Sequence, residues 1–190
     1  MKKTMLLTVI MFVIAVAGVP AAEKAKAPEA KKNSKVDVIE GFEDEGEPTD
    51  KWDFDYEAEG AIVSDHATEG KKAMKLSLPE ATGEQYPGFF AEESKFNSLF
   101  PNDWTGYEEF QADVFNDSET GVLITVKFKS NQKEIYNKEI TLPKKKNYTI
   151  KIKTKDMKVE LGNMTNFKIF VCGIPIKSTL YIDNIRLVKK

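Results

Sequence analysis

Cysteine and histidine are almost missing from the 190 residues, because the chain has one of each, Cys172 and His66. A single cysteine excludes an internal disulfide, so the stability of the fold has to come from a hydrophobic core. Cys172 lies in an apolar stretch and is expected in that core. A single histidine excludes a metal site built from several histidines, and the sequence shows no strong nucleophile–base arrangement around it. His66 lies among polar residues, which predicts a plain surface role.

An excess of positive charge is missing as well. The chain has 28 lysine and arginine residues against 30 aspartate and glutamate residues, which gives a formal net charge of −2. Nucleic-acid binding depends on basic surfaces that neutralise phosphates. We therefore expect no nucleic-acid partner.

The N-terminal residues are expected to lie outside the fold. Lys2 and Lys3 precede an apolar run, Met5–Gly18, and Val19–Ala21 supplies the small residues that signal peptidase accepts. As a helix the run spans about 21 Å, which is short of the hydrocarbon core of about 30 Å. We predict a cleaved signal peptide at 1–21 and a charged flexible tether at 22–35, with an uncleaved anchor as the alternative. The mature protein is then secreted, in the periplasm or on the surface of a bacterium, and spans no membrane.

From residue 36 onward, short β-branched and aromatic runs alternate with turn residues. Eleven strands at regular spacing, with no long amphipathic helix, predict an all-β fold for 36–190, an antiparallel β-sandwich of two sheets. A single helical turn is expected near Asp156–Leu161. The expected strands are Val36–Glu43, Trp52–Tyr56, Ala61–Ser64, Ala73–Leu78, Phe89–Glu93, Glu109–Asn116, Val122–Ser130, Ile135–Leu142, Tyr148–Thr154, Phe167–Cys172 and Thr179–Val188.

The last strand changes its parity. Leu180 and Ile182 point to one face, whereas Ile185 and Leu187 point to the other in a regular strand. Both pairs stay in the core only if an extra residue forms a β-bulge near Asp183. A carboxylate at such a bulge needs partners, and backbone N–H groups or a metal ion supply them.

Five segments follow one another in the order Glu40–Asp44, Ala67–Leu76, Asp103–Tyr107, Asp113–Asn116 and Leu180–Leu187. Together they resemble the galactose-binding-domain-like jelly rolls, the superfamily that contains many carbohydrate-binding modules of bacterial glycoside hydrolases. The resemblance spans nearly all of 36–190 and implies a jelly-roll sandwich that binds a glycan.

The same resemblance implies a structural calcium ion. In those modules the ion joins the N-terminal strand, an early loop and the last strand. Here it would be bound by the Glu43 carboxylate, the Lys71 backbone carbonyl and the Asp183 carboxylate, which are oxygen ligands suited to calcium. The alternative is that Glu43 is solvated and that Asp183 only caps its bulge.

A glycan site needs exposed aromatic rings together with amides and carboxylates. Gln111, Asp113 and Phe115 share the non-core parity of one strand, with Lys127 and Tyr136 expected alongside. These residues form a candidate sugar-binding face. The alternative is an ordinary solvated sheet face.

A second aromatic candidate is Trp52, which shares one face of its strand with Phe54 and Tyr56. An aromatic stripe at strand spacing is more often part of a core, and as an exposed platform it would be a strong stacking surface. Trp104 is expected to plug one end of the sandwich.

The sequence therefore predicts a secreted, non-catalytic glycan-binding protein, with two alternatives. The first is an assembly protein of the bacterial envelope that binds other envelope proteins, because the phrase Asp37–Glu43 resembles the N-terminus of spirochaete flagellar sheath proteins. The second is a small jelly-roll glycosidase or lyase. A sugar binder is expected to show neighbouring exposed rings, an assembly protein an apolar patch or free edge strand, and an enzyme a deep cleft with paired carboxylates.

Overall fold

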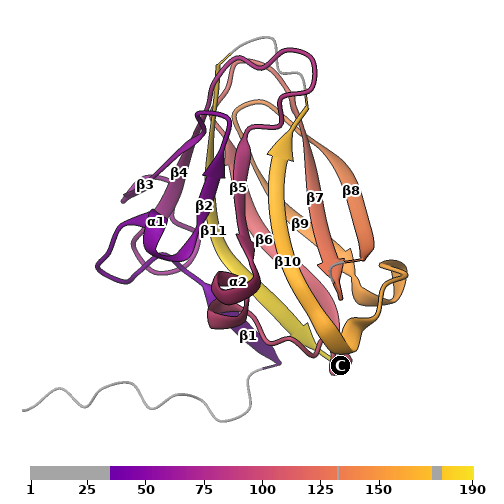
Figure 1. Cartoon of the computed structure of the whole chain (residues 1–190). Helices are drawn as coiled ribbons and strands as arrows, with labels where there is room; N and C mark the ends of the chain where they lie inside the picture. The colour runs from indigo at the N-terminus through magenta and orange to yellow at the C-terminus, as the bar shows by residue number, and fades with distance from the viewer. Residues whose placement is uncertain (1–34, 132, 173–176) are drawn as a thin grey trace, which may run out of the picture. The chain divides into compact units, whose positions relative to one another are not determined.

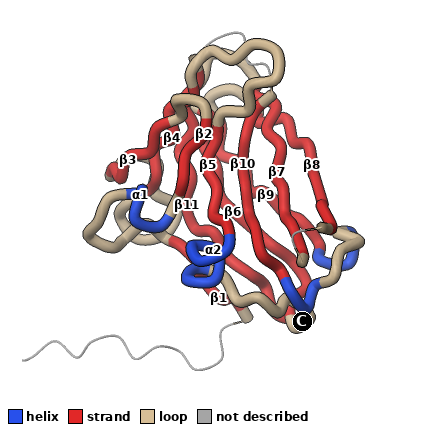
Figure 2. Tube along the Cα trace, viewed as in Figure 1, coloured by secondary structure: helices blue, strands red, loops and turns tan. Residues whose placement is uncertain are grey.

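The computed structural model describes residues 35–131, 133–172 and 177–190, which form two antiparallel sheets stacked face to face (Figures 1 and 2). The predicted signal peptide and nearly all of the predicted tether lie outside the described residues. No helix among the described residues is long and apolar enough to cross a membrane.

The six-stranded sheet has the order β3-β4-β11-β6-β9, and β1 pairs with β11 beside this path. Its strands come from both ends of the described chain, and the last strand, β11, lies in the centre of the sheet. They are β1 (Val36–Glu40), β3 (Glu59–Val63), β4 (Ala73–Leu78), β6 (Tyr107–Asn116), β9 (Lys146–Lys153) and β11 (Ser178–Lys189).

The five-stranded sheet has the order β2-β5-β10-β7-β8. Its strands are β2 (Asp53–Asp55), β5 (Gly88–Glu92), β7 (Val122–Ser130), β8 (Glu134–Leu142) and β10 (Met164–Val171). Four short helices lie in the connections between strands, namely α1 (Pro48–Lys51), α2 (Glu93–Leu99), η1 (Thr154–Asp156) and η2 (Leu161–Asn163). The predicted all-β sandwich is confirmed.

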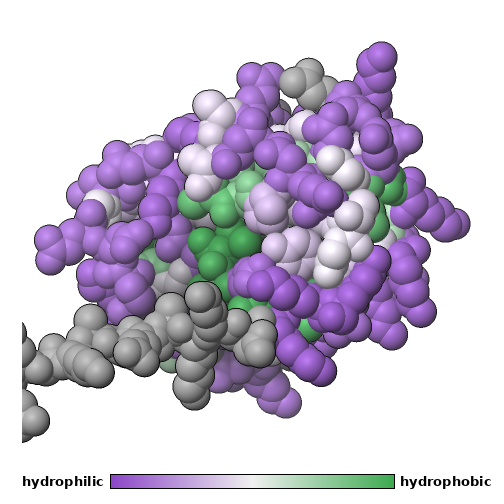
Figure 3. All heavy atoms as spheres, turned by 90° about the horizontal axis from the view of Figure 1, so that it is seen from below, coloured by the Kyte–Doolittle hydropathy of each residue, from purple (hydrophilic) through white to green (hydrophobic). Residues whose placement is uncertain are grey.

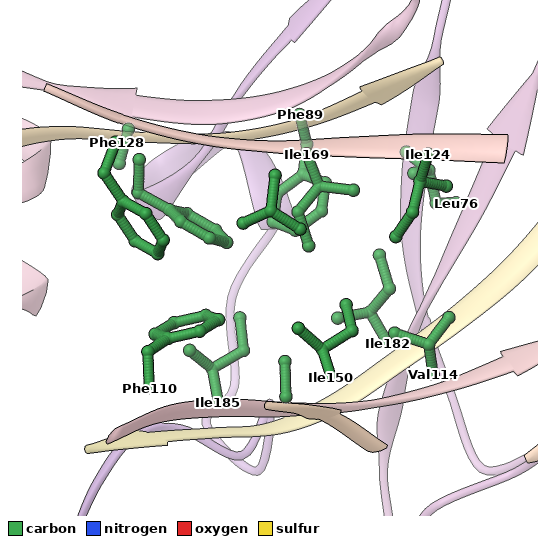
Figure 4. Close-up of a cluster of buried hydrophobic side chains, with 14 of the residues drawn as sticks. Leu76, Phe89, Phe110, Val114, Ile124, Phe128, Ile150, Ile169, Ile182 and Ile185 are labelled. Atoms are coloured by element: carbon green, nitrogen blue, oxygen red, sulfur yellow. The ribbon is translucent and has the colours of Figure 1, made fainter. Parts of the chain in front are cut away.

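The core lies between the two sheets and is built by the predicted alternation. On β6, Phe110, Ala112 and Val114 are buried, and the residues between them face outward. Figure 4 shows buried side chains of one sheet pointing toward those of the other, for example Phe110 toward Phe128, whose ring centroids are 5.0 Å apart. Alternation on a pleated strand explains why one face of each sheet is apolar and the other is wetted.

The predicted bulge in β11 is confirmed. The pairing of β11 with β6 shifts between Asp183 and Arg186, and Asn184 takes a φ of 50°, a left-handed conformation that asparagine tolerates. All four apolar residues around the bulge are therefore buried, namely Leu180, Ile182, Ile185 and Leu187.

Two expectations about the fold are wrong. Helix α2 follows β5 directly, where no helix was expected, because its seven residues bury only Phe96 and show no long amphipathic period. Cys172 is exposed and not in the core, because β10 ends one residue before it, at Val171.

Candidate functional site

Gln111, Asp113 and Phe115 lie together on the outer face of β6, as the alternation predicts. Asp113 accepts hydrogen bonds from Arg186 Nη1 at 2.8 Å, Thr149 Oγ1 at 2.8 Å and Asn184 Nδ2 at 3.0 Å. Arg186 Nε donates to Gln111 Oε1 at 2.9 Å. We call these five residues, Gln111, Asp113, Thr149, Asn184 and Arg186, the polar network.

The side chains of the polar network satisfy one another's hydrogen-bonding groups. Burial alone would raise the pKa of Asp113, but hydrogen bonds from Arg186 and Thr149 outweigh it and lower that pKa. The carboxylate is therefore ionised and paired with the guanidinium. Side chains that already bind one another offer few free donors or acceptors to a ligand, which favours a structural role for this face.

Phe115 is also engaged by its neighbours. The His66 ring stacks on it with centroids 3.7 Å apart and an angle of 11° between the planes. Tyr181 contacts the same histidine at a centroid distance of 4.5 Å. One face of the Phe115 ring is therefore covered, and His66 packs against rings where a plain surface role was expected.

The other predicted glycan residues do not join this face. Lys127 lies on β7 of the five-stranded sheet, on its outer side. Tyr136 lies opposite Phe128 and packs against the core, and Trp52 is 1% exposed with its ring against Phe89 and Phe167. Lys127 was expected beside Gln111 because their strands follow one another in the sequence. The chain crosses from one sheet to the other between β6 and β7, so these two strands are not neighbours.

The outer face of the five-stranded sheet carries a different group of side chains. Registered pairs place Asp53, Phe90, Lys168, Lys127 and Asn137 opposite one another in a single row across all five strands. Phe170 lies two residues beyond Lys168 on the same face of β10. The strands that carry these residues lie side by side in Figure 1.

Aromatic rings and a cation occupy the centre of this face. The Lys168 Nζ lies 5.3 Å from the ring centroid of Phe90 and 5.2 Å from that of Phe170, and it forms an ion pair with Asp55. Tyr86 meets Phe170 edge-on at a centroid distance of 5.8 Å. We call Tyr86, Phe90, Lys127, Lys168 and Phe170 the aromatic face.

The aromatic face continues to a more exposed pair of rings. Tyr56 and Tyr86 have centroids 6.3 Å apart, and their exposed fractions are 48% and 37%. Two neighbouring exposed rings meet the condition set above for a sugar binder. Ring faces cover the apolar C–H groups of a sugar, and the ammonium, carboxylate and amide groups nearby suit its hydroxyls.

Gly88 permits the close approach of β5 and β10 at this site. A Cβ atom there would lie 2.1 Å from the backbone oxygen of Ile169 and 2.7 Å from the Cβ of Phe170. Only glycine fits between the two strands without moving backbone.

Periodicity did not single out Phe90 and Phe170, because each lies in a run that is apolar on both parities. A usable signal was present in Phe89-Phe90, since adjacent residues of a strand point to opposite faces and both rings cannot enter one core. The structure buries Phe89 and leaves Phe90 on the outer side.

Hydrogen-bond donors surround the carboxylates predicted to bind calcium. Asp183 Oδ2 accepts the amide N–H groups of Thr68 at 2.6 Å and Glu69 at 2.8 Å. Glu43 Oε1 accepts those of Lys71 and Lys72, both at 2.7 Å, and these bonds lower the pKa of Glu43.

In this arrangement, backbone N–H groups donate to both carboxylates that are predicted to bind the ion. No group of three or more histidine, cysteine, aspartate or glutamate side chains placed to hold a metal occurs among the described residues. Calcium stays a prediction of the sequence.

A cavity of about 380 Å³ lies beside α1, between the residues that follow β1 and the Trp52 ring. Its buried carboxylate, Glu40, accepts hydrogen bonds from Lys51 Nζ and from the Phe42 amide, both at 2.8 Å. The same lysine pairs with Asp44 at 2.8 Å and lowers the pKa of that carboxyl. Asp44 is thus held ionised, unlike the general acid of a glycosidase, which needs a raised pKa.

Comparison with known proteins gives structural matches only. No family model and no curated protein matches the sequence. The family 11 carbohydrate-binding module from Clostridium thermocellum, solved in complex with a beta-1,3-1,4-mixed-linked tetrasaccharide, matches with a TM-score of 0.59 and 18% identity over 81% of this chain and 95% of that module.

Two further matches extend the comparison. A carbohydrate-binding module described as specific for non-crystalline cellulose, CBM28, has a TM-score of 0.58 and 15% identity over 80% of this chain and 94% of the module. An exo-beta-agarase has a TM-score of 0.66 and 16% identity over 80% of this chain, which spans only 25% of that enzyme. The chain therefore has the jelly-roll β-sandwich fold of the carbohydrate-binding modules, as the sequence resemblance implied.

Proposed function

We propose that this protein binds a glycan, without catalysis, through the aromatic face of its five-stranded sheet. The observation that carries the proposal is the continuous series of rings from Tyr56 and Tyr86 through Phe170 to Phe90, with Lys168 between the last two. Carbohydrate-binding modules with the same fold, one of them solved with a tetrasaccharide, support this reading.

The site combines two kinds of contact that sugars require. Rings offer apolar stacking surfaces, and the row across the sheet adds the carboxylate of Asp53, the ammonium of Lys127 and the amide of Asn137. Asp53 already pairs with Lys95 at 2.6 Å, whereas the side chains of Lys127 and Asn137 form no ion pair or hydrogen bond with any residue that the structure describes, unlike those of the polar network, in which each side chain binds another. A ligand therefore gains more on the aromatic face.

None of the three carboxyl groups described above has the raised pKa of a glycosidase general acid. Glu43, Asp44 and Asp113 each have a pKa below the ordinary value, caused by lysine or arginine partners or by backbone N–H groups. A glycosidase needs one carboxyl group that stays protonated near neutral pH. We include secretion in the proposal, because the predicted signal peptide would bring the protein to extracellular or periplasmic polysaccharides.

The test is a binding screen of the purified protein against polysaccharides, with two matched tyrosine variants. Tyr86→Ala removes an exposed ring from the aromatic face, whereas Tyr148→Ala removes a ring of nearly equal exposure, 37% against 38%, from β9 of the other sheet. Loss of one stacking ring is expected to weaken binding by about 1 kcal/mol or more, roughly fivefold to tenfold, in Tyr86→Ala only. Binding that both variants weaken equally, or that neither affects, would place the ligand elsewhere.

The alternative is an envelope assembly protein that uses the sandwich for protein contacts. Among the described residues, the exposed aliphatic side chains Val38, Leu123 and Ile135 lie on three different strands, β1, β7 and β8. The face seen in Figure 3 is mostly hydrophilic around a smaller hydrophobic area. A failed polysaccharide screen together with capture of an envelope protein that Tyr86→Ala releases would favour this alternative.

A further inference from the structure

Lys127 lies at a position of the aromatic face where its positive charge destabilises the sheet. It lies directly opposite Lys168 on the neighbouring strand β10, and Lys129 follows two residues later on the same side of β7. Like charges at opposite positions of paired strands destabilise a sheet. Three lysine residues therefore lie close together on one sheet face.

Two of these three lysines have partners of opposite charge. Lys168 pairs with Asp55, and Lys129 pairs with Glu92 at 3.3 Å. Lys127 forms no ion pair or side-chain hydrogen bond with any residue that the structure describes. It is only half-exposed, and burial, followed by the charges of Lys129 and Lys168, lowers its pKa.

Acidic residues nearby offset this charge only in part, because Glu92 raises the pKa of Lys127 by less than burial, Lys129 and Lys168 lower it. Glu92 is already engaged by Lys129 and by the amide of Asn166 at 2.7 Å. Glu139 lies on the neighbouring strand β8, opposite Thr125 and so diagonal to Lys127, and is fully exposed. Its charge is not among those that act on Lys127.

We infer that the ligand of the aromatic face is an acidic glycan, whose carboxylate or sulfate group binds Lys127 beside the rings of Phe90 and Phe170. This inference rests on the proposed function and narrows it to a substrate class. An anion placed between Lys127 and Lys168 relieves their repulsion and forms charge-assisted hydrogen bonds in a partly desolvated place. Adjacent strands are about 4.8 Å apart, so a sugar on the Phe90 ring and an anion at Lys127 are roughly 10 Å apart, within one short oligosaccharide.

The experiment compares polymer pairs that differ in charge. One pair is polygalacturonate and its methyl ester, and the other is a sulfated galactan and the corresponding neutral galactan. The purified protein is expected to bind one acidic member at least tenfold more tightly than its neutral partner, and to lose most of that preference between 0.05 and 0.5 M salt. Carboxylate and sulfate are distinguished by which pair responds.

The variant is Lys127→Met, with Lys151→Met on the outer face of β9 as the control for general charge loss. Lys127→Met is expected to weaken acidic binding roughly tenfold, while its melting temperature stays equal or rises because the repulsion with Lys168 and Lys129 is gone. Lys151→Met is expected to leave both quantities unchanged. Unfolding of the variant therefore cannot imitate the predicted result.

Three kinds of outcome overturn the inference. Equal binding to both members of each pair, or binding to neutral polymers alone, refutes the acidic ligand while the proposed function stands. Equal weakening by Lys127→Met and Lys151→Met shows unspecific attraction and also refutes it. Absence of binding to every polymer overturns the inference together with the proposed function.

Discussion

Arg186, the single arginine of the chain, connects three strands on the outer face of the six-stranded sheet. Its guanidinium lies on β11 and reaches Asp113 and Gln111 of β6, and Asp113 in turn accepts a hydrogen bond from Thr149 of β9. A guanidinium suits this position because it donates to several acceptors in fixed geometry, which a lysine cannot do. The polar network therefore fastens strands that are far apart in the sequence.

Asp113→Asn is expected to lower the free energy of unfolding at neutral pH by about 1–3 kcal/mol, because Arg186 loses its counter-ion and the network loses acceptors. The folded state lowers the pKa of Asp113. Its stabilisation is therefore complete above the unfolded pKa of about 3.9 and is lost as the pH falls through the lower folded pKa.

Urea unfolding from pH 2 to pH 7 checks this expectation. The variant should show a smaller loss of stability on acidification than the wild type, and glycan binding should be retained. Equal stability of the two proteins at pH 7, or loss of binding by a folded variant, would contradict the structural role of Asp113.

At the scale of elements, the bulge in β11 decides how the central strand fits the core. It keeps Leu180 and Ile185 on the same buried side although they are five positions apart. It also turns Asp183, 1% exposed, toward the loop before β4, where Thr68 and Glu69 donate their N–H groups. One carboxylate therefore fixes both the bulge and the loop.

Asp183→Ala is expected to cost about 2–4 kcal/mol of stability, because the N–H groups of Thr68, Glu69 and Asn184 lose their acceptor in a buried place. Asp183→Asn retains one acceptor oxygen and should lose less. The measurement is the free energy of unfolding in urea. A loss below 0.5 kcal/mol in Asp183→Ala would show that the carboxylate does not hold the loop.

The same variants test calcium. If an ion replaces the N–H partners of Asp183 and Glu43, the melting temperature of the wild type rises in millimolar calcium relative to chelator, since binding to the folded state alone stabilises it. Asp183→Ala should abolish that rise. Identical melting of the wild type in both buffers would refute the calcium prediction.

The elements differ in how well the sequence predicts them. The eleven strands follow from β-branched and aromatic runs between turn residues, and the bulge follows from period-2 alternation, because an apolar face has to meet the core. Helix α2 escapes prediction because it depends on tertiary burial of Phe96 and not on a local period. The outward position of Phe90 and Phe170 was not predicted, because alternation cannot tell which face of a strand is buried when both faces are apolar. Lys127 was grouped with Gln111 because the sequence does not show that the chain crosses from one sheet to the other between β6 and β7.

At the scale of the whole molecule, the two outer faces of the sandwich have different chemistry. The face of the six-stranded sheet is closed by the polar network and by the stack of His66 on Phe115. The face of the five-stranded sheet keeps the exposed rings of Tyr56 and Tyr86 and the ammonium of Lys127 available. A ligand is therefore expected on only one side of the molecule.

The measurement that tests this claim most directly is a heteronuclear NMR titration of the labelled protein with a polysaccharide fragment found in the screen. The account predicts that the largest amide shift changes fall on β5, β10 and β7, around Phe90, Lys168 and Lys127, and that residues around Gln111 and Asp113 stay unchanged. Shift changes concentrated on β6 and β9 would contradict it and return the site to the polar network.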